Sequence, residues 1–288
     1  MPTPTVRRLL LGHELRHLRE EAECGLEDAA KAIGRTDSTI SRVELGQTGL
    51  TKRDLHALVS FYASKIGRRK VEVDWYVEQS KGSQQRGRWS GYRSVYAKFF
   101  RMAVDLEEDA SVISQYQTEA ITGLLQTEHY MRALFTTQRV RVVDQDLEDA
   151  VRARLDRQRV LTKPNSAQVR FVMSESSLRR VVGDEEIMRG QLEHLAEVAS
   201  LPNVQLQVLP FTARTPAQVN FNFTMFRIDS PGTSGPLEFV YVEELHDGKY
   251  VDDQRVVKDY DELWNALVGS ALDPVESREL ILNLVKEA

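Results

Sequence analysis

Residues 26–46, LEDAAKAIGRTDSTISRVELG, have the pattern of two short helices joined by a tight turn. The first helical segment ends at Gly34, a residue that suits the left-handed backbone conformation found after a helix. Thr36 or Asp37 can then accept hydrogen bonds from the exposed backbone amides at the start of the second segment. The stretch therefore predicts a helix, a turn and a second helix.

The spacing of four residues in this stretch indicates how the two helices pack. Ala30, Gly34, Ile40 and Val43 lie at offsets 0, +4, +10 and +13. Ala30 lets the helices approach, Gly34 supports the turn, and the two branched residues face inward. This arrangement holds the second helix at the angle that suits a DNA major groove, so the spacing predicts a helix-turn-helix.

Two further helices are expected on either side of this pair. The first runs from Val6 to Ala22, and its apolar stripe consists of Leu11, Leu15, Leu18 and Ala22. The last begins at Thr51, and its apolar residues are Leu55, Leu58, Val59 and Tyr62. We expect the four helices to share one core over residues 1–68.

The segment LREEAECGLEDAAKAIGRTDSTISRVELGQTGLT, residues 18–51, resembles the XRE (Cro/repressor-like) helix-turn-helix family. The resemblance extends over about residues 7–65 and implies an all-α DNA-binding domain. A four-helix module that binds only protein is the alternative, because a fold alone does not determine function.

One face of the second helix and its flanks are left for DNA if Ile40 and Val43 point inward. The expected DNA-binding residues are Arg35, Thr36, Asp37, Ser38, Thr39, Ser41, Arg42 and Gln47. Arg42 can bind guanine in a bidentate manner or contact a phosphate, while the hydroxyls suit phosphates or base edges. Phosphates repel Asp37, so this residue either caps the helix or accepts a hydrogen bond from cytosine.

The sequence HELRH, residues 13–17, matches the H-E-x-x-H pattern of zinc peptidases. The apolar stripe of the same helix places His13 and His17 on the opposite face, which we expect to be solvated. A catalytic zinc also needs a third ligand and a cleft. We therefore expect no catalytic residues, no metal site, no cofactor and no enzymatic activity.

Composition and charge place the chain among globular proteins with two different parts. The 288 residues are 41% hydrophobic and 28% charged, and Cys24 has no second cysteine to pair with. The net charge of −5 divides into +7 for residues 1–101 and −12 for the remainder. No apolar run approaches the ~20 residues of a membrane span, so we expect a cytoplasmic protein.

The rest of the chain alternates helical and strand-like patterns. Helices are expected at Ser94–Asp109, Leu124–Thr136, Gln145–Leu161, Glu175–Val182, Asp184–Ala199, Gln254–Val268 and Pro274–Glu287. Strands are expected at Val112–Tyr116, Val169–Met173, Val204–Leu209, Phe221–Ile228 and Leu237–Val242. They predict an α/β or α+β domain with a mixed sheet.

The expected domains are therefore a helix-turn-helix domain at 1–68, a basic linker at 69–90 and a regulatory and dimerisation domain at 91–288. In the linker region, Trp89 and Tyr92 can stack on bases while nearby arginines bind the DNA backbone. We favour the interpretation that these aromatic residues begin the core of the following domain.

The second part resembles the carboxyl-terminal domain of WhiJ-like, antitoxin-like actinobacterial regulators. The matching stretches from about Trp89 onward are GLLQTEHYMRAL, RARLDRQRVL, VRFVMSESSLRRVVG, EIMRGQLEHLAEVASLPNVQLQVLPF, FVYVEEL and SRELI. The resemblance implies a transcriptional regulator of development or specialised metabolism, often encoded beside a small partner protein. Thr122 stands where that family usually has Pro, so the resemblance does not extend to the local turn.

Four residues of this domain are candidates for binding a ligand. Arg157 and Arg159 can bind an anionic group, although a solvated helix face explains them as well. Glu175 can cap a helix or orient a ligand, and Glu243 lies at a strand end, where ligands often bind.

The sequence as a whole favours a homodimeric regulator that binds double-stranded DNA and senses a small molecule or a protein partner. An antitoxin-like protein that mainly sequesters a small partner is the alternative, and an enzyme tethered to DNA is a third hypothesis.

Overall fold

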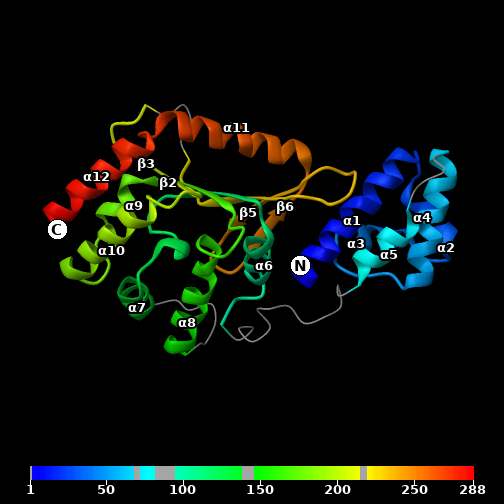
Figure 1. The fold of residues 1–288 in the computed structure, drawn as a ribbon, viewed down its shortest axis with the longest axis horizontal. Coiled ribbons are helices and arrows are strands. Elements are labelled where there is room, and N and C mark those ends of the chain that lie inside the picture. Colours follow the sequence, from blue (N-terminus) through cyan, green and yellow to red (C-terminus); the bar gives the residue numbers. More distant parts are fainter. Residues whose placement is uncertain (1, 68–71, 82–94, 138–145, 215–218) are drawn as a thin grey trace. The chain divides into compact units, whose positions relative to one another are not determined.

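The computed structural model describes residues 2–67, 72–81, 95–137, 146–214 and 219–288. The chain divides into two compact units (Figure 1). The first comprises Met1–Ser90 together with Asp229–Leu237, and the second comprises Gly91–Ile228 with Glu238–Ala288. In the described residues, no helix is long and apolar enough to cross a membrane.

The first unit is helical, as the sequence predicts. Its helices are α1 (Pro4–Glu21), α2 (Leu26–Ile33), α3 (Asp37–Glu44), α4 (Lys52–Ile66) and α5 (Val73–Ser80). Threonine side chains cap three of them, at Thr3, Thr36 and Thr51. Gly34 ends α2 with φ +63°, the left-handed conformation that glycine adopts without strain.

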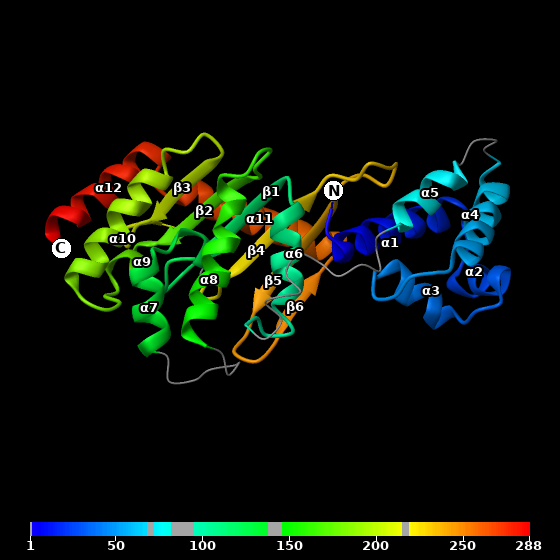
Figure 2. The same ribbon diagram turned by 60° about the horizontal axis from the view of Figure 1, so that its bottom comes forward.

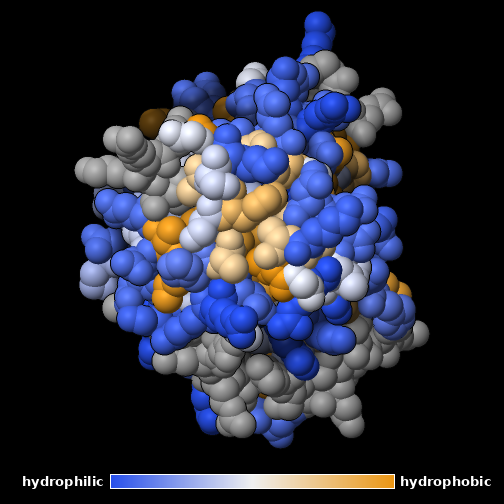
Figure 3. Space-filling model, turned by 90° about the vertical axis from the view of Figure 1, so that its right-hand side faces the viewer, coloured by the Kyte–Doolittle hydropathy of each residue, from blue (hydrophilic) through white to orange (hydrophobic). Residues whose placement is uncertain are grey.

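The core of this unit explains the fixed position of α3. Ile40 and Val43 of α3 are buried against Leu15 and Leu18 of α1, together with Leu55, Leu58, Val59 and Tyr62 of α4. The inward orientation predicted for Ile40 and Val43 is therefore confirmed. Apolar side chains gather in one area on the face drawn in Figure 3, and hydrophilic residues surround them.

Helix α5 corrects the sequence interpretation of residues 69–90 as a linker. Residues 73–80 form a helix that packs against α1 and α4. Tyr76 is buried, and Val73, Trp75 and Val77 pack against the core. The surrounding basic and polar residues conceal this short apolar pattern. Trp89 and Tyr92 lie outside the described residues.

The second unit contains a six-stranded mixed sheet, which confirms the expected fold class. The strands are β1 (Val112–Gln117), β2 (Gln168–Ser174), β3 (Val204–Leu209), β4 (Phe223–Ile228), β5 (Leu237–Glu243) and β6 (Gly248–Val251). Their order is β3-β2-β1-β4-β5-β6 (Figure 2). The pairs β1–β2 and β2–β3 are parallel, whereas β1–β4 and β5–β6 are antiparallel.

Helices cover both faces of this sheet (Figure 1). They are α6 (Arg101–Asp109), α7 (Glu128–Thr137), α8 (Leu147–Gln158), α9 (Glu175–Arg179), α10 (Glu185–Val198), α11 (Gln254–Ser270) and α12 (Pro274–Glu287). The described part of the unit also contains the short 3₁₀ turns η2 (Gly123–Leu125) and η3 (Arg159–Leu161). Helix α11 packs Trp264 and Leu267 against Tyr116 and Val240 of the sheet, opposite the face covered by α6, α7 and α8.

The structure corrects three expected helices of this unit. The helix expected at Glu175–Val182 ends at Arg179, because the chain is extended at Arg180. The helix expected at Leu124–Thr136 consists of η2 followed by α7, because the chain is extended at Gln126. Helix α6 begins at Arg101, later than the expected start at Ser94, which lies outside the described residues. Strand β6 has four residues, and the sequence reading did not predict it.

Candidate functional site

The amino-terminal end of α3 presents short polar side chains to solvent. Thr36 is the cap, and its Oγ1 accepts a hydrogen bond from the Thr39 amide at 3.3 Å. Asp37 is the first residue of the helix, where its Oδ1 accepts from the Ser38 amide at 2.7 Å. The expected alternative in which Asp37 caps α3 is therefore wrong. A carboxylate in the first turn still interacts favourably with the helix dipole.

The other expected DNA-binding residues lie around the same helix. Arg42 is exposed, and its Nε donates to the Ser38 carbonyl at 3.3 Å, which leaves the terminal nitrogens of the guanidinium facing solvent. Ser38 and Gln47 are also exposed, whereas Thr39 and Ser41 are half-buried. Six of the eight expected residues are exposed: Arg35, Thr36, Asp37, Ser38, Arg42 and Gln47.

Arg35 also makes a contact within the first unit that the sequence did not indicate. Its guanidinium pairs with Asp54 of α4, and the shortest N–O distance is 2.7 Å. This ion pair ties the turn before α3 to the first turn of α4. The Arg35 guanidinium lowers the pKa of Asp54 below its ordinary value, and the charged form of the pair is thereby favoured.

The position of α3 is also set from the side of α1. Arg19 binds the Glu44 carboxylate through two hydrogen bonds of 2.7 and 3.0 Å, and both side chains are largely buried. Gly12 of α1 lies so close to α3 that an added Cβ would be 2.4 Å from the Glu44 carbonyl oxygen. A bidentate ion pair and a close helix contact thus hold the end of α3.

The H-E-x-x-H segment has a structural partner in the first unit. Glu14 is 1% exposed and accepts four hydrogen bonds from Ser230, Thr233 and Ser234, over distances of 2.5–3.2 Å. Burial opposes its ionisation, but these donors hold the pKa of Glu14 below its ordinary value. The carboxylate is therefore engaged by protein donors.

The expectation that both histidines of this segment are solvated is wrong, because His13 is half-buried. Burial lowers the pKa of His13, which favours the neutral ring. In the part of the chain that the structure describes, no group of three or more His, Cys, Asp or Glu residues could hold a metal ion.

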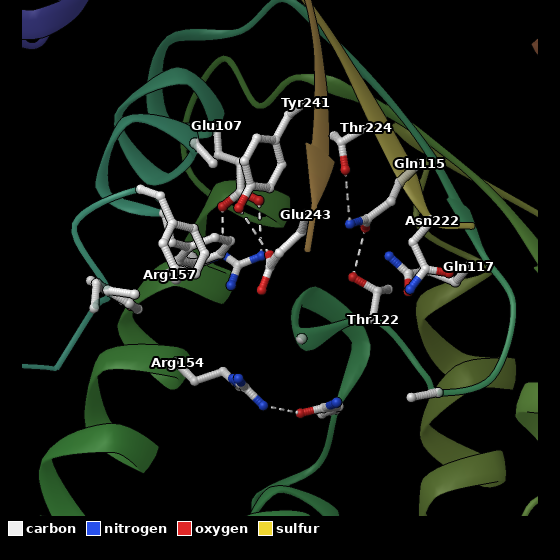
Figure 4. A pocket seen from close by; sticks show the side chains of 18 of the residues that line it. Glu107, Gln115, Gln117, Thr122, Arg154, Arg157, Asn222, Thr224, Tyr241 and Glu243 are labelled. Carbon is white, nitrogen blue, oxygen red and sulfur yellow. Dashed lines mark hydrogen bonds and ion pairs between the residues drawn. The ribbon is translucent and has the colours of Figure 1, made fainter. Parts of the chain in front are cut away.

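The second unit contains a cavity of about 560 Å³ (Figure 4). It is formed by α6, α8, η2 and the strands β1, β4 and β5, together with residues 95–100. This volume falls in the range of small-molecule sites, ~300–1,000 Å³. Aromatic and aliphatic side chains line it together with polar groups that converge from several elements, which is the usual composition of a ligand pocket.

An ion pair forms one wall of the cavity. Arg157 of α8 binds both carboxylate oxygens of Glu107 from α6, at 2.5 and 2.9 Å, and both side chains are buried. The Arg157 guanidinium also lies over the Phe100 ring at 4.9 Å. Nearby, the Tyr241 hydroxyl donates to Glu243 at 3.0 Å. Burial among the cavity walls raises the pKa of Glu243, although the Tyr241 hydrogen bond opposes this shift.

A chain of hydrogen bonds forms the opposite wall (Figure 4). The Thr122 hydroxyl donates to Gln115 Oε1 at 2.6 Å, and Gln115 Nε2 donates to the Thr224 hydroxyl at 3.1 Å. Thr122 has φ −57°, a value that proline also adopts, so the backbone here follows a course that suits either residue. The Thr122 hydroxyl adds a donor that proline lacks.

The cavity contains some of the expected ligand-binding residues. Arg157 and Glu243 line it. Arg159 is exposed and pairs with Asp156 at 3.3 Å, away from the cavity. Glu175 does not line the cavity either, and the expectation that it caps a helix is wrong, because Ser174 is the cap of α9. Its carboxylate instead accepts hydrogen bonds from Arg179 and from the Phe211 amide.

Sequence reasoning did not identify Arg154, Gln115, Thr122 or Asn222 as lining residues. A signal for Arg154 was present, since it lies three residues before Arg157 on the same helix and therefore on the same face.

The fold and α3 define the class of the protein as one with an amino-terminal helix-turn-helix domain. Consistent with this, a family described as "Helix-turn-helix domain" matches residues 10–68. The chain belongs to the family described as "Domain of unknown function (DUF5753)", which matches residues 100–283. No curated protein and no solved structure shows significant similarity to the chain.

Proposed function

We propose that this protein is a sequence-specific transcriptional regulator of the XRE type, in which α3 reads the DNA major groove. The observation that carries the proposal is the division of α3 into two faces. Ile40 and Val43 are buried, whereas Ser38 and Arg42 are exposed. Short hydroxyl donors beside one arginine suit phosphates and guanine.

The proposal includes a homodimer that acts in the cytoplasm. Repressors with this helix pair bind two half-sites about one helical turn apart, so each protomer of a dimer contributes one α3. We assign dimerisation to the second unit, which also provides the effector cavity. The resemblance to WhiJ-like regulators supports a role in development or specialised metabolism.

A second candidate function rests on charge. Residues 102–288 have a balance of −12, which favours association with a small basic protein. In this alternative the protein mainly sequesters its partner, as an antitoxin does. Catalysis has less support than binding, because the carboxylate of the H-E-x-x-H segment is held by protein donors.

Selection of DNA by the full-length protein tests the main proposal. The immobilised protein is incubated with sheared genomic DNA from its source, and retained fragments are sequenced. We expect enrichment of one palindromic site, since a symmetric dimer reads two equal half-sites. Lack of enrichment, together with a stable complex with a small protein, would favour the antitoxin-like alternative.

A further inference from the structure

The cavity of the second unit contains a second arginine, Arg154, whose hydrogen-bond partner is a neutral amide. Arg154 of α8 donates from one terminal nitrogen to Gln126 Oε1 at 2.7 Å, and its guanidinium lies 4.4 Å from the centre of the Phe135 ring. Among the described residues, no carboxylate forms an ion pair with it. Arg157, one turn later on the same helix, has Glu107 as its partner.

The surroundings of Arg154 make this cation costly to keep unpaired. Burial and the nearby Arg157 lower its pKa to about 10, so the protein destabilises the charged form relative to water. The side chain is still protonated at neutral pH. An anion that binds the free side of the guanidinium offsets this cost, because it supplies the missing charge and hydrogen-bond acceptors.

The charge balance of the whole cavity limits the charge of that anion. Three carboxylates, those of Glu107, Glu243 and Glu244, lie in the lining beside the two arginines, and Glu244 also pairs with Lys249. A phosphate monoester with two negative charges is repelled by this set. A planar carboxylate carries one charge and matches the fork of a single guanidinium.

The remaining walls of the cavity indicate the chemical character of the rest of the ligand, apart from its carboxylate. Phe99, Phe100, Leu134 and Phe135 line the cavity and offer apolar surface. On the opposite side, Asn222 accepts hydrogen bonds from Thr118 through its oxygen, and its side-chain nitrogen has no acceptor among the described residues. The cavity volume of about 560 Å³ accommodates a small organic molecule.

We propose that this cavity binds a small organic acid with one carboxylate and an apolar body, and that the carboxylate pairs with Arg154. Glu107 holds Arg157 in place, and Arg154 is the residue that distinguishes an acid from its neutral analogue. The role of this acid as an effector rests on the proposed regulatory function. Its binding to the cavity does not, because binding can be measured without DNA.

Isothermal titration of the full-length protein with matched probes tests the proposal. The probes are 4-phenylbutanoate, indole-3-acetate and decanoate, and each is compared with its neutral amide. Phenyl phosphate is titrated as well, to test whether a phosphate ester binds in place of a carboxylate. We expect at least one carboxylate to bind the wild type at least tenfold more tightly than its amide and than phenyl phosphate. This comparison needs no variant and is therefore independent of any folding defect.

Variants of α8 then assign the binding to Arg154. We expect Arg154→Gln to weaken carboxylate binding at least tenfold, and Arg154→Lys to bind with intermediate affinity. Arg152→Gln is the matched control, because Arg152 is exposed on the same helix and is absent from the cavity lining. Far-ultraviolet circular dichroism and thermal unfolding establish that each variant is folded.

Three results would overturn the inference: no carboxylate binds below about 1 mM, amides bind as well as acids, or a folded Arg154→Gln variant binds as the wild type does. Tighter binding of phenyl phosphate would contradict the choice of a carboxylate. These failures are distinct from failure of the regulatory function, which would show as a lack of specific DNA binding by the same protein.

Discussion

At the scale of single residues, Arg42 is the main candidate for base recognition. Its guanidinium is exposed on α3, and one bidentate contact to guanine contributes ~1–3 kcal/mol of discrimination. We predict that Arg42→Ala weakens binding to the enriched site by about this amount and leaves binding to scrambled DNA nearly unchanged. Fluorescence anisotropy titrations of both duplexes measure the difference.

Arg152→Ala is the control for this prediction, because it removes the same charge from an exposed position in the other unit. Equal losses on both duplexes would show that Arg42 contacts phosphate and carries no sequence information. Unchanged binding to both would remove Arg42 from the interface.

Glu14 provides a prediction about pH. Its hydrogen bonds to Ser230, Thr233 and Ser234 depress its folded-state pKa. The resulting stability is present above the unfolded pKa of ~4.3 and is lost as the pH falls through the lower folded value. We predict that Glu14→Gln destabilises the first unit by ~1–3 kcal/mol at pH 7 and that the difference from the wild type shrinks at acidic pH.

Thermal unfolding between pH 3 and pH 7 measures this difference. Glu20→Gln is the matched control, because Glu20 lies on the same helix but is exposed. A constant difference between wild type and Glu14→Gln at every pH would show that ionisation of Glu14 contributes nothing.

At the scale of secondary structure elements, the contact between α1 and α3 depends on Gly12. We predict that Gly12→Ala destabilises the protein by ~1–3 kcal/mol, because the new Cβ would overlap the carbonyls of Val43 and Glu44 and displace α3. Specific DNA binding should fall in parallel. Chemical denaturation and anisotropy measure the two effects.

Gly190→Ala is the opposite case and serves as the control. Gly190 lies within α10, and among the described residues no atom outside its own helix and chain neighbours lies within 4 Å of an added Cβ. Alanine there should stabilise the protein by ~0.4–1 kcal/mol through the entropy of the unfolded chain. If both substitutions change the free energy of unfolding in the same direction, the close contact of α1 with α3 does not determine stability.

The sequence predicted the helices and strands in which apolar residues recur at the regular spacing along the whole element. Pro274–Glu287 and Val204–Leu209 have the expected bounds, because a capping aspartate precedes the helix and Val204, Leu206 and Val208 alternate with glutamines along the strand. Helix α5 was missed since its eight residues stand among basic and polar residues. Strand β6 was missed because four residues at a sheet edge have little apolar pattern.

At the scale of the whole molecule, sequence reasoning could not assemble the cavity. Its lining comes from positions between Val95 and Leu245, and only the packing of α6 and α8 near the sheet brings these residues together. The same limit applies to Asp229–Leu237, which joins β4 to β5 yet clusters with the first 90 residues. Hydrogen bonds between residues more than 200 positions apart, such as Ser230 and Glu14, leave no local pattern.

Symmetry gives a prediction at this scale. If two protomers bind one palindrome, inserting five base pairs between the half-sites turns them to opposite faces of the duplex. We predict a loss of affinity of roughly tenfold or more, because the second half-site no longer benefits from a high effective concentration. Inserting ten base pairs is the control, because a full helical turn returns both half-sites to the same face of the duplex. Equal affinity for the original and five-base-pair duplexes would indicate independent protomers.

The ratio of affinities for the enriched site and for a scrambled duplex of equal length tests the central claim most directly. Both dissociation constants are measured for the full-length protein by anisotropy at one physiological salt concentration. A regulator whose α3 reads base edges should bind the enriched site at least ~10³-fold more tightly. Equal affinities for the two duplexes would contradict sequence-specific recognition by this helix.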